Sequence, residues 1–255
     1  MGAFYGTFIE HWPPEVAALS FPTRLHTLSE EDVTALLTQH AETRALLGYE
    51  RRARFSEALL RWVEEAIAHF PGGAFVRLGA CSFVTPERGP RAVRNGEQAV
   101  KLLMHPGERA ASLAYRCYRA AQPVALCVRE WRDIAPSSEF RIFIRNREVV
   151  GASQYHWRRA FPELEGSAAE TAGVVRRAAS SVAAASHLES VVADIYLTGT
   201  DAEASWVLIE LNPYSTASGP CLFSWEEGFD GTFRYLAPDG SLRALPLSVS
   251  DAPGV

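Results

Sequence analysis

The chain has 255 residues, of which 47% are apolar, so it is long enough to bury a core in one large domain or in two smaller lobes. Its formal net charge of -5 and its isoelectric point near 5.8 argue against a surface built mainly to bind nucleic acid or anionic lipid. Any anion-binding site must therefore be local.

The N-terminus lacks a basic region followed by an apolar core, and no apolar run reaches the roughly 18 to 20 residues that a membrane span needs. We therefore expect no secretion signal, no membrane segment and a cytoplasmic location. Widely spaced cysteines without a CxxC pair are interpreted as free thiols rather than zinc ligands or disulfides: Cys81, Cys117, Cys127 and Cys221.

Arginine dominates the basic residues, because only Lys101 among the 25 lysines and arginines is a lysine. Any phosphate-binding site must therefore use arginine, whose planar guanidinium stays charged and offers paired hydrogen-bond donors. A general arginine bias of the genome is the simpler explanation for most of the count.

The first half of the chain predicts helices and one strand. Apolar residues at helical spacing, opened by cap residues such as Ser29 and Asn95, predict helices within 28–47, 54–73 and 95–105. The segment 74–84 is predicted to be a strand that carries Arg77. Lys101 is expected to face solvent on the last of the three helices.

The middle of the chain predicts a strand followed by an antiparallel hairpin. Residues 123–131 form a short apolar run, and residues 139–155 alternate in polarity on both sides of Asn146. Because successive side chains of a strand point to opposite faces, Glu139 and Arg141 are displayed together. Their face is either exposed to solvent or part of a binding cleft.

A second hairpin is predicted after an alanine-rich helix at 167–188, with its turn at 198–205. One arm places Asp194 among apolar residues, and the other carries Glu210 and Asn212 on one face. A lone strand aspartate is usually a hydrogen-bonded structural acid, and an Asn-Pro pair is usually a turn. The three together, however, supply oxygen ligands of the kind that Mg²⁺ takes alongside substrate phosphates.

The chain contains no Walker A, GxGxxG, GxSxG or HExxH pattern. Residues 55–230 instead resemble the cell division cycle protein 123 family, a divergent ATP-grasp group. The resemblance rests on Trp131 followed by Glu139-Phe140-Arg141, on Gly151 with Ser153-Gln154, on the Asp194 strand, and on Asn212-Pro213 followed by Leu222-Phe223 and Trp225-Glu226-Glu227.

The resemblance implies an α+β ATP-grasp fold in which two lobes with largely antiparallel sheets clasp ATP. The expected lobes are residues 1–122, including the N-terminal helices, and residues 123–255. The cofactors implied are ATP and Mg²⁺, with no nucleic acid and no membrane as partner.

The site residues implied by the resemblance fall into two groups. Asp194, Glu210 and Asn212 match the Mg²⁺ ligands, and Arg141 resembles the arginine near the terminal phosphates, where it would act in catalysis. Nucleotide contacts are implied for Arg77, Arg94, Val128, Arg129, Glu130, Trp131, Glu139 and Arg141. The chain departs from the family at position 77, usually lysine, and at position 210, usually aspartate in eukaryotic members.

Two functions are compatible with this resemblance. In the first, the protein is a ligase: it phosphorylates a carboxylate, and an amine or thiol then attacks the acylphosphate. A peptide or small molecule would be the acceptor, held by Arg129, by Arg145 or by the segment 156–161. In the second, ATP is a structural clasp for binding a protein partner, as in eukaryotic members that assemble translation initiation factor two.

The composition is more like that of a bacterial protein, for which that initiation factor is not expected as partner. An apolar patch for a protein partner is predicted at 4–12, unless Phe4, Tyr5 and Trp12 pack onto the core. The C-terminal tail is expected to form two short strands around Asp239-Gly240 and then to be disordered.

Overall fold

The structure is a computed structural model that describes residues 2–84, 89–199 and 205–247. The chain forms two compact units: unit 1 comprises Met1–Thr7, His11–Phe21 and Asp133–Val255, and unit 2 comprises Phe8–Glu10 and Pro22–Arg132. This division differs from the boundary at 122/123 suggested by the sequence, because the strand at 125–130 pairs within unit 2. Residues 200–204 of the turn predicted at 198–205, and the tail at 248–255, lie outside the described residues.

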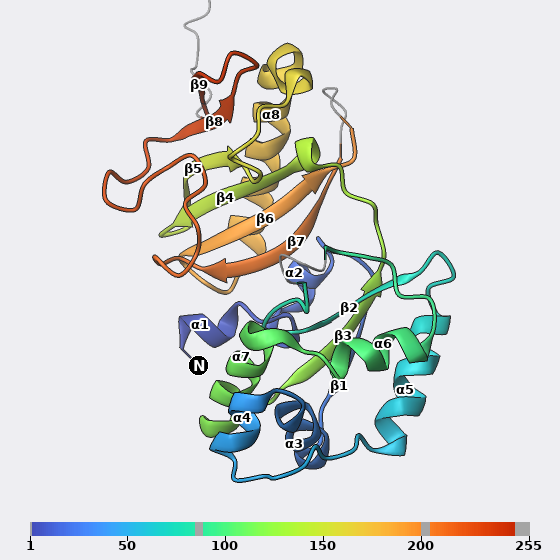
Figure 1. The fold of residues 1–255 in the computed structure, drawn as a ribbon. Helices are drawn as coiled ribbons and strands as arrows, with labels where there is room; N and C mark the ends of the chain where they lie inside the picture. Colours follow the sequence, from blue (N-terminus) through green and yellow to red (C-terminus); the bar gives the residue numbers. More distant parts are fainter. Residues whose placement is uncertain (1, 85–88, 200–204, 248–255) are drawn as a thin grey trace, which may run out of the picture. The chain divides into compact units, whose positions relative to one another are not determined.

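Unit 2 is built on a three-stranded antiparallel sheet in the order β1-β3-β2 (Figure 1). Its strands are β1 (Thr23–Thr27), β2 (Ala74–Leu78) and β3 (Ala125–Glu130). Its helices are α3 (Glu30–Gln39), α4 (Ala41–Leu46), α5 (Glu57–Ala68), α6 (Gly96–Leu103) and α7 (Gly107–Arg119), and the short helix η1 (Ile9–His11) begins in this unit. The predicted strand at 74–84 is therefore shorter than expected, and β1 precedes it.

Side-chain caps define where the helices of unit 2 begin. Ser29 and Asn95 accept hydrogen bonds from the backbone N–H groups of Asp32 and Gln98, at 3.1 and 3.0 Å, so both predicted caps are confirmed. The Asp32 carboxylate is 2% exposed and accepts hydrogen bonds from the hydroxyls of Ser29 and Ser56. This one carboxylate thereby links the N-termini of α3 and α5.

Unit 1 is built on a six-stranded sheet in the order β7-β6-β4-β5-β8-β9, in which only the pair β5 and β8 is parallel among the described strands. Its strands are β4 (Glu139–Arg145), β5 (Glu148–Gln154), β6 (Val191–Leu197), β7 (Trp206–Pro213), β8 (Thr232–Leu236) and β9 (Leu242–Pro246). Its helices are α1 (Ala3–Gly6), α2 (Pro14–Ala17), the short helix η2 (Pro136–Ser138) and α8 (Pro162–Ala185). The long helix α8 packs along one face of this sheet (Figure 1).

Both predicted hairpins of unit 1 are confirmed. The β4–β5 turn places Asn146 and Arg147 at φ of 52° and 66°, the left-handed conformation that tight hairpin turns require. The Arg147 guanidinium donates to the carbonyls of Ala183 and Ser186, which lie at the C-terminal end of α8. The hairpin turn is thus tied to the helix behind the sheet.

The outer edge of β7 is covered by the segment that follows α2. The backbone N–H of Leu208 donates to the Leu19 carbonyl at 2.8 Å, and the Ser20 hydroxyl donates to the Leu208 carbonyl. At the opposite edge, β9 is short and largely exposed. The expected turn at Gly240, with φ of 80°, joins β8 to β9.

An aromatic cluster covers one end of the sheet face opposite α8. We call Phe143, Tyr214, Phe223, Trp225 and Phe229 the aromatic cap; the ring centroids of Phe143 and Phe229 are 4.3 Å apart. Four of its members come from the segment 214–229, which closes over the strand residue Phe143. Within the described residues, no helix is long and apolar enough to cross a membrane.

Gly151 provides the space that the aromatic cap needs, because a Cβ atom there would lie 2.9 Å from Cζ of Phe223. We predict that Gly151→Ala lowers the free energy of unfolding by about 1–3 kcal/mol through overpacking. Urea denaturation measures the change. The matched control is Gly166→Ala in α8, where an added Cβ meets nothing within 4 Å and should stabilise the helix by about 0.5–1 kcal/mol. Equal effects of the two substitutions would contradict the packing argument.

Candidate functional site

A buried ion pair joins two neighbouring inner strands of the sheet in unit 1. Arg141 on β4 lies directly opposite Asp194 on β6. Its Nε and Nη2 atoms donate to Oδ1 and Oδ2 of Asp194, both at 2.7 Å, and the two side chains are 8% and 1% exposed. This is the bidentate geometry in which a guanidinium binds a carboxylate most strongly.

Arg141 also fixes the segment that carries the aromatic cap. Its Nη1 donates to the Gly219 carbonyl at 2.9 Å, and its guanidinium lies over the Tyr155 ring, 4.9 Å from the centroid. One side chain therefore connects β4, β6, the end of β5 and the segment after β7.

Glu210 and Asn212 lie beside this ion pair. Asp194 is the direct cross-strand partner of Glu210, and a register shift in β7 at this point skips Ile209. Such a bulge changes where a strand aims its side chains. The Asn212 amide nitrogen donates to Asp194 Oδ2 at 3.0 Å and to Glu210 Oε1 at 3.3 Å. The second hairpin thus brings the three predicted metal ligands together.

The site holds more negative than positive charge. Burial raises the pKa of the Asp194 carboxyl to about 7; Arg141 opposes this, and the carboxylates of Glu210 and Glu139 add to it. Burial also raises the pKa of the Tyr155 hydroxyl, with the Asp194 carboxylate as the next cause. Burial alone would lower the pKa of the Arg141 guanidinium. The charge and hydrogen bonds of Asp194 outweigh this effect and raise that pKa.

The chemistry of these residues fits a hard divalent cation. Two carboxylates and an amide are the oxygen donors that Mg²⁺ takes, and an added positive charge would relieve the repulsion that raises the pKa of Asp194. Binding requires the Asn212 amide to rotate, since its nitrogen faces both carboxylates here. No cluster of three or more His, Cys, Asp or Glu with metal-ligand geometry occurs in the described part of the chain.

Glu139 begins the strand that carries Arg141 and meets His156. Oε2 of Glu139 is 3.0 Å from Nε2 of His156, an exposed side chain at the start of the segment 156–161 that was considered for holding an acceptor. The contact arises because the β4–β5 pairing brings the segment after Gln154 back to the start of β4. The tautomer of the imidazole determines which atom donates.

In unit 2, two predicted arginines share one face of the sheet. Arg77 lies opposite Cys127, and Arg129 lies opposite Phe75 two residues along the same pair of strands. The two arginine side chains are 3% and 2% exposed; Nε of Arg77 donates to the Leu78 carbonyl and Nε of Arg129 to the Thr23 hydroxyl. Both are therefore held in fixed positions on the β2–β3 pair.

The other predicted nucleotide residues of unit 2 are placed differently. Val128 is fully buried and lies opposite Val76, so only its backbone is suited to a ligand contact. Glu130 pairs with Arg132 at 2.9 Å, and Trp131 is half-buried with its backbone N–H donating to the Gly73 carbonyl. Arg94 is exposed just before α6.

Glu10, which the sequence did not single out, is a buried carboxyl near Arg77. An added Cβ at Gly79 would lie 1.6 Å from Glu10 Oε2, so the carboxyl rests against bare backbone. That oxygen has no hydrogen-bond partner among the described residues. Burial raises the pKa of Glu10 to about 7, while hydrogen bonds to the backbone of Glu10 and Ala125, and then the charge of Arg77, lower it only in part.

Three further predictions can be compared with the structure. The four cysteines are free thiols, as expected, and burial raises the pKa of Cys127 to about 12. The apolar patch predicted at 4–12 is not an exposed patch, because Phe8, Ile9 and Trp12 are buried. The Trp12 indole N–H donates to the Thr7 carbonyl at 2.9 Å. Lys101 faces solvent, as predicted, and pairs with Glu97.

Comparison with known proteins places this chain in a family. The fold matches the solved structure of Cdc123 from Schizosaccharomyces pombe with a TM-score of 0.70 at 15% identity, covering 88% of this chain and 90% of that one. The expected α+β class with largely antiparallel sheets is therefore confirmed. A family model described as D123 matches residues 107–242, which is more than half of the 255 residues. The chain belongs to the D123 family.

Two curated relatives are similar over a shorter segment. The translation initiation factor eIF2 assembly protein of Kluyveromyces lactis is 35% identical over 103 residues, which cover 40% of this chain and 27% of the relative. Cell division cycle protein 123 of Eremothecium gossypii is 33% identical over 109 residues, covering 40% and 28%. The matching segment thus spans less than a third of either relative.

The buried ion pair gives a stability prediction. Asp194→Asn leaves a buried guanidinium without its counter-charge, and we expect it to cost about 3–5 kcal/mol of unfolding free energy. Arg141→Met should cost less at low pH, where Asp194 becomes neutral. In a double-mutant cycle followed by urea denaturation, the double variant should be more stable than the sum of the single changes implies. Strict additivity would show that the pair contributes no coupling energy.

Glu10 gives a pH prediction. Because its pKa is raised in the folded state, its contribution to stability is complete below about pH 4.5 and is lost as the pH rises through about 7. Glu10→Gln removes this dependence, so the variant should gain roughly 2 kcal/mol relative to the parent protein between pH 5 and 8. Denaturation at several pH values measures the difference in unfolding free energy between the variant and the parent protein. Titrating groups that both proteins share cancel from this difference. A difference that does not change with pH would contradict the assignment.

Proposed function

We propose that this protein binds ATP together with Mg²⁺ on the polar sheet face of unit 1, and that the Mg-ATP state governs binding of a protein partner. The proposal rests on the cluster formed by Arg141, Asp194, Glu210 and Asn212. In this cluster one guanidinium lies beside two carboxylates, so the cluster lacks one positive charge. A magnesium ion would supply the missing positive charge and leave one further charge to pair with phosphate oxygens.

Each residue of the cluster has a defined part in this proposal. Asp194, Glu210 and Asn212 would hold the Mg²⁺, which when bound neutralises charge on the phosphate oxygens. Arg141 is fixed by Asp194 and is proposed to lie near the terminal phosphates, where a preorganised cation needs no rearrangement to stabilise charge. The further proposed nucleotide contacts are Arg77, Arg94, Val128 through its backbone, Arg129, Glu130, Trp131 and Glu139.

A protein partner is proposed because the similar curated proteins are named as assembly proteins. A ligand controls such binding only if it has different affinities for two states of the protein. Arg141 offers a means for this, since the same guanidinium contacts Asp194 at the metal cluster and the Gly219 carbonyl in the segment that carries the aromatic cap. The four free thiols are compatible with the reducing cytoplasm as the location.

ATP-dependent ligation is the second candidate function. Here a carboxylate oxygen would attack the γ-phosphorus and release ADP, and an amine or thiol would then displace phosphate from the acylphosphate. Arg145, exposed at the end of β4, favours this candidate, because an acceptor carboxylate needs a cationic partner.

Glu210→Gln tests the proposed metal site without breaking the buried ion pair. It removes one negative charge beside Asp194 while keeping the shape of the side chain. We expect Mg-dependent ATP affinity, measured by calorimetric titration with and without Mg²⁺, to fall at least about tenfold. The matched control is Glu170→Gln, an exposed change on α8. Unchanged Mg-dependence in Glu210→Gln would remove the metal assignment.

Phosphorus NMR of the protein with Mg-ATP separates the two functions. Binding without turnover over hours is the result expected for a nucleotide-dependent partner-binding protein. Accumulation of ADP when candidate acceptors are added would favour ligation instead. Absence of any ATP binding would overturn both candidates.

A further inference from the structure

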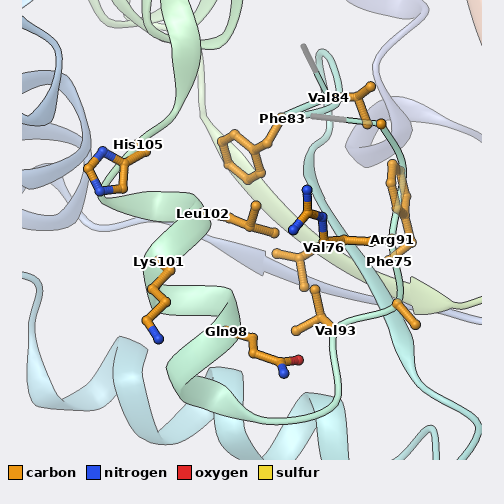
Figure 2. A pocket seen from close by; sticks show the side chains of 12 residues that line it. Phe75, Val76, Phe83, Val84, Arg91, Val93, Gln98, Lys101, Leu102 and His105 are labelled. Carbon is orange, nitrogen blue, oxygen red and sulfur yellow. The ribbon is translucent and has the colours of Figure 1, made fainter. Parts of the chain in front are cut away.

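Unit 2 contains a pocket with a volume of about 450 Å³, which is within the range of small-molecule sites. Its walls come from β2, from the segment before α6, and from α6 itself (Figure 2). It is lined by none of the residues that the resemblance assigns to ATP. The pocket is therefore distinct from the proposed nucleotide contacts.

Backbone hydrogen bonds hold the walls of the pocket in place. Val93 and Ala74 exchange two N–H to carbonyl bonds of 2.8 Å, which attach the segment before α6 to β2. At the start of α6, the Gly96 N–H donates to the Glu64 carboxylate on α5 at 2.8 Å. The walls are thus formed before any ligand binds, which lowers the cost of binding.

The interior of the pocket is apolar. Val76, Phe83 and Val93 are 1%, 3% and 2% exposed, and Phe75 and Leu102 complete the apolar wall. These side chains present mainly carbon surface, so a ligand that fills the pocket must have a compact apolar body.

The polar groups of the pocket are cationic or neutral. Arg91, Lys101, Gln98 and His105 line it, and its lining contains no acidic side chain among the residues that the structure describes. In Figure 2, Arg91 extends across the pocket towards Leu102 from the wall opposite α6. Lys101 pairs with Glu97 at 2.7 Å, but both side chains are mostly exposed, so this pair is weak. Arg91 is itself exposed, and a guanidinium that borders an apolar pocket favours a ligand with a negatively charged group.

We propose that this pocket binds a small organic carboxylate with an aromatic or branched aliphatic body. The carboxylate pairs with Arg91, with Lys101 adding charge at the rim, and the body contacts Val76, Phe83 and Leu102. Neither a bare inorganic anion nor a neutral apolar molecule satisfies both parts of the pocket.

The probe for this proposal is 2-naphthoate, and 2-naphthamide is the neutral ligand of the same shape. Titration of the full chain, followed by naphthalene fluorescence and by amide shifts in ¹⁵N-labelled protein, should show saturable binding of 2-naphthoate. The shifts should centre on residues 75–76, 91–93 and 98–105. The affinity for 2-naphthamide should be at least about tenfold weaker.

Arg91→Met removes the charge and keeps the aliphatic stem, so it should lower the affinity for 2-naphthoate about tenfold and abolish the preference over 2-naphthamide. The matched control is Arg119→Met, an exposed change on α7 that should leave both affinities unchanged. Circular dichroism checks that both variants are folded.

Three results would overturn the proposal: equal affinities of the two ligands for the parent protein, an unchanged 2-naphthoate affinity in Arg91→Met, or no saturable binding. Saturating Mg-ATP should leave 2-naphthoate binding unchanged, and its displacement by ATP would also overturn the proposal by placing the pocket within the nucleotide site. The affinities for 2-naphthoate and 2-naphthamide are measured without ATP. The test therefore remains valid even if the protein does not bind ATP.

Discussion

The pair of Arg141 and Asp194 is the interaction on which the rest of unit 1 depends. A guanidinium and a carboxylate that are both removed from water must satisfy one another, because either alone would carry a large desolvation penalty. Their bidentate contact fixes the positions of β4 and β6, and the remaining donor of Arg141 reaches the Gly219 carbonyl. The same side chain therefore serves the sheet, the metal cluster and the segment that carries the aromatic cap.

This pair also changes how Asp194 is understood. From the sequence alone, an aspartate in an apolar strand called for a compensating charge, and a metal ion was the candidate. The structure shows that Arg141 supplies part of that compensation. The surplus of carboxylates around one guanidinium favours a cation. The Asn212 amide must rotate to accommodate one, because its nitrogen occupies the place where a metal would need its oxygen.

Short-range sequence patterns predicted the helix caps and the two hairpins of unit 1. The alternation around Asn146, the caps at Ser29 and Asn95, and the strand pair carrying Asp194 and Glu210 all follow from short-range spacing and turn chemistry. The pairing of Arg141 with Asp194 could not be predicted in this way, because the register between β4 and β6 is set by contacts across more than fifty residues.

Other elements were missed for related reasons. The strand β1 has mostly exposed or half-buried residues and owes its existence to pairing with β3. Glu10 was missed because its sequence neighbours do not reveal that its carboxyl packs against Gly79, which has no side chain in the way. Both features depend on residues brought together only by the completed fold.

The two edges of the six-stranded sheet carry different risks of self-association. The edge at β9 is short, and Arg243 and Pro246 make it a poor template for another strand. At the edge of β7, Leu19 and Ser20 occupy both backbone groups of Leu208. Displacement of that N-terminal segment would uncover a strand that also bears Glu210 and Asn212. The segment therefore acts as a guard against intermolecular β-pairing at the strand where the candidate site is built.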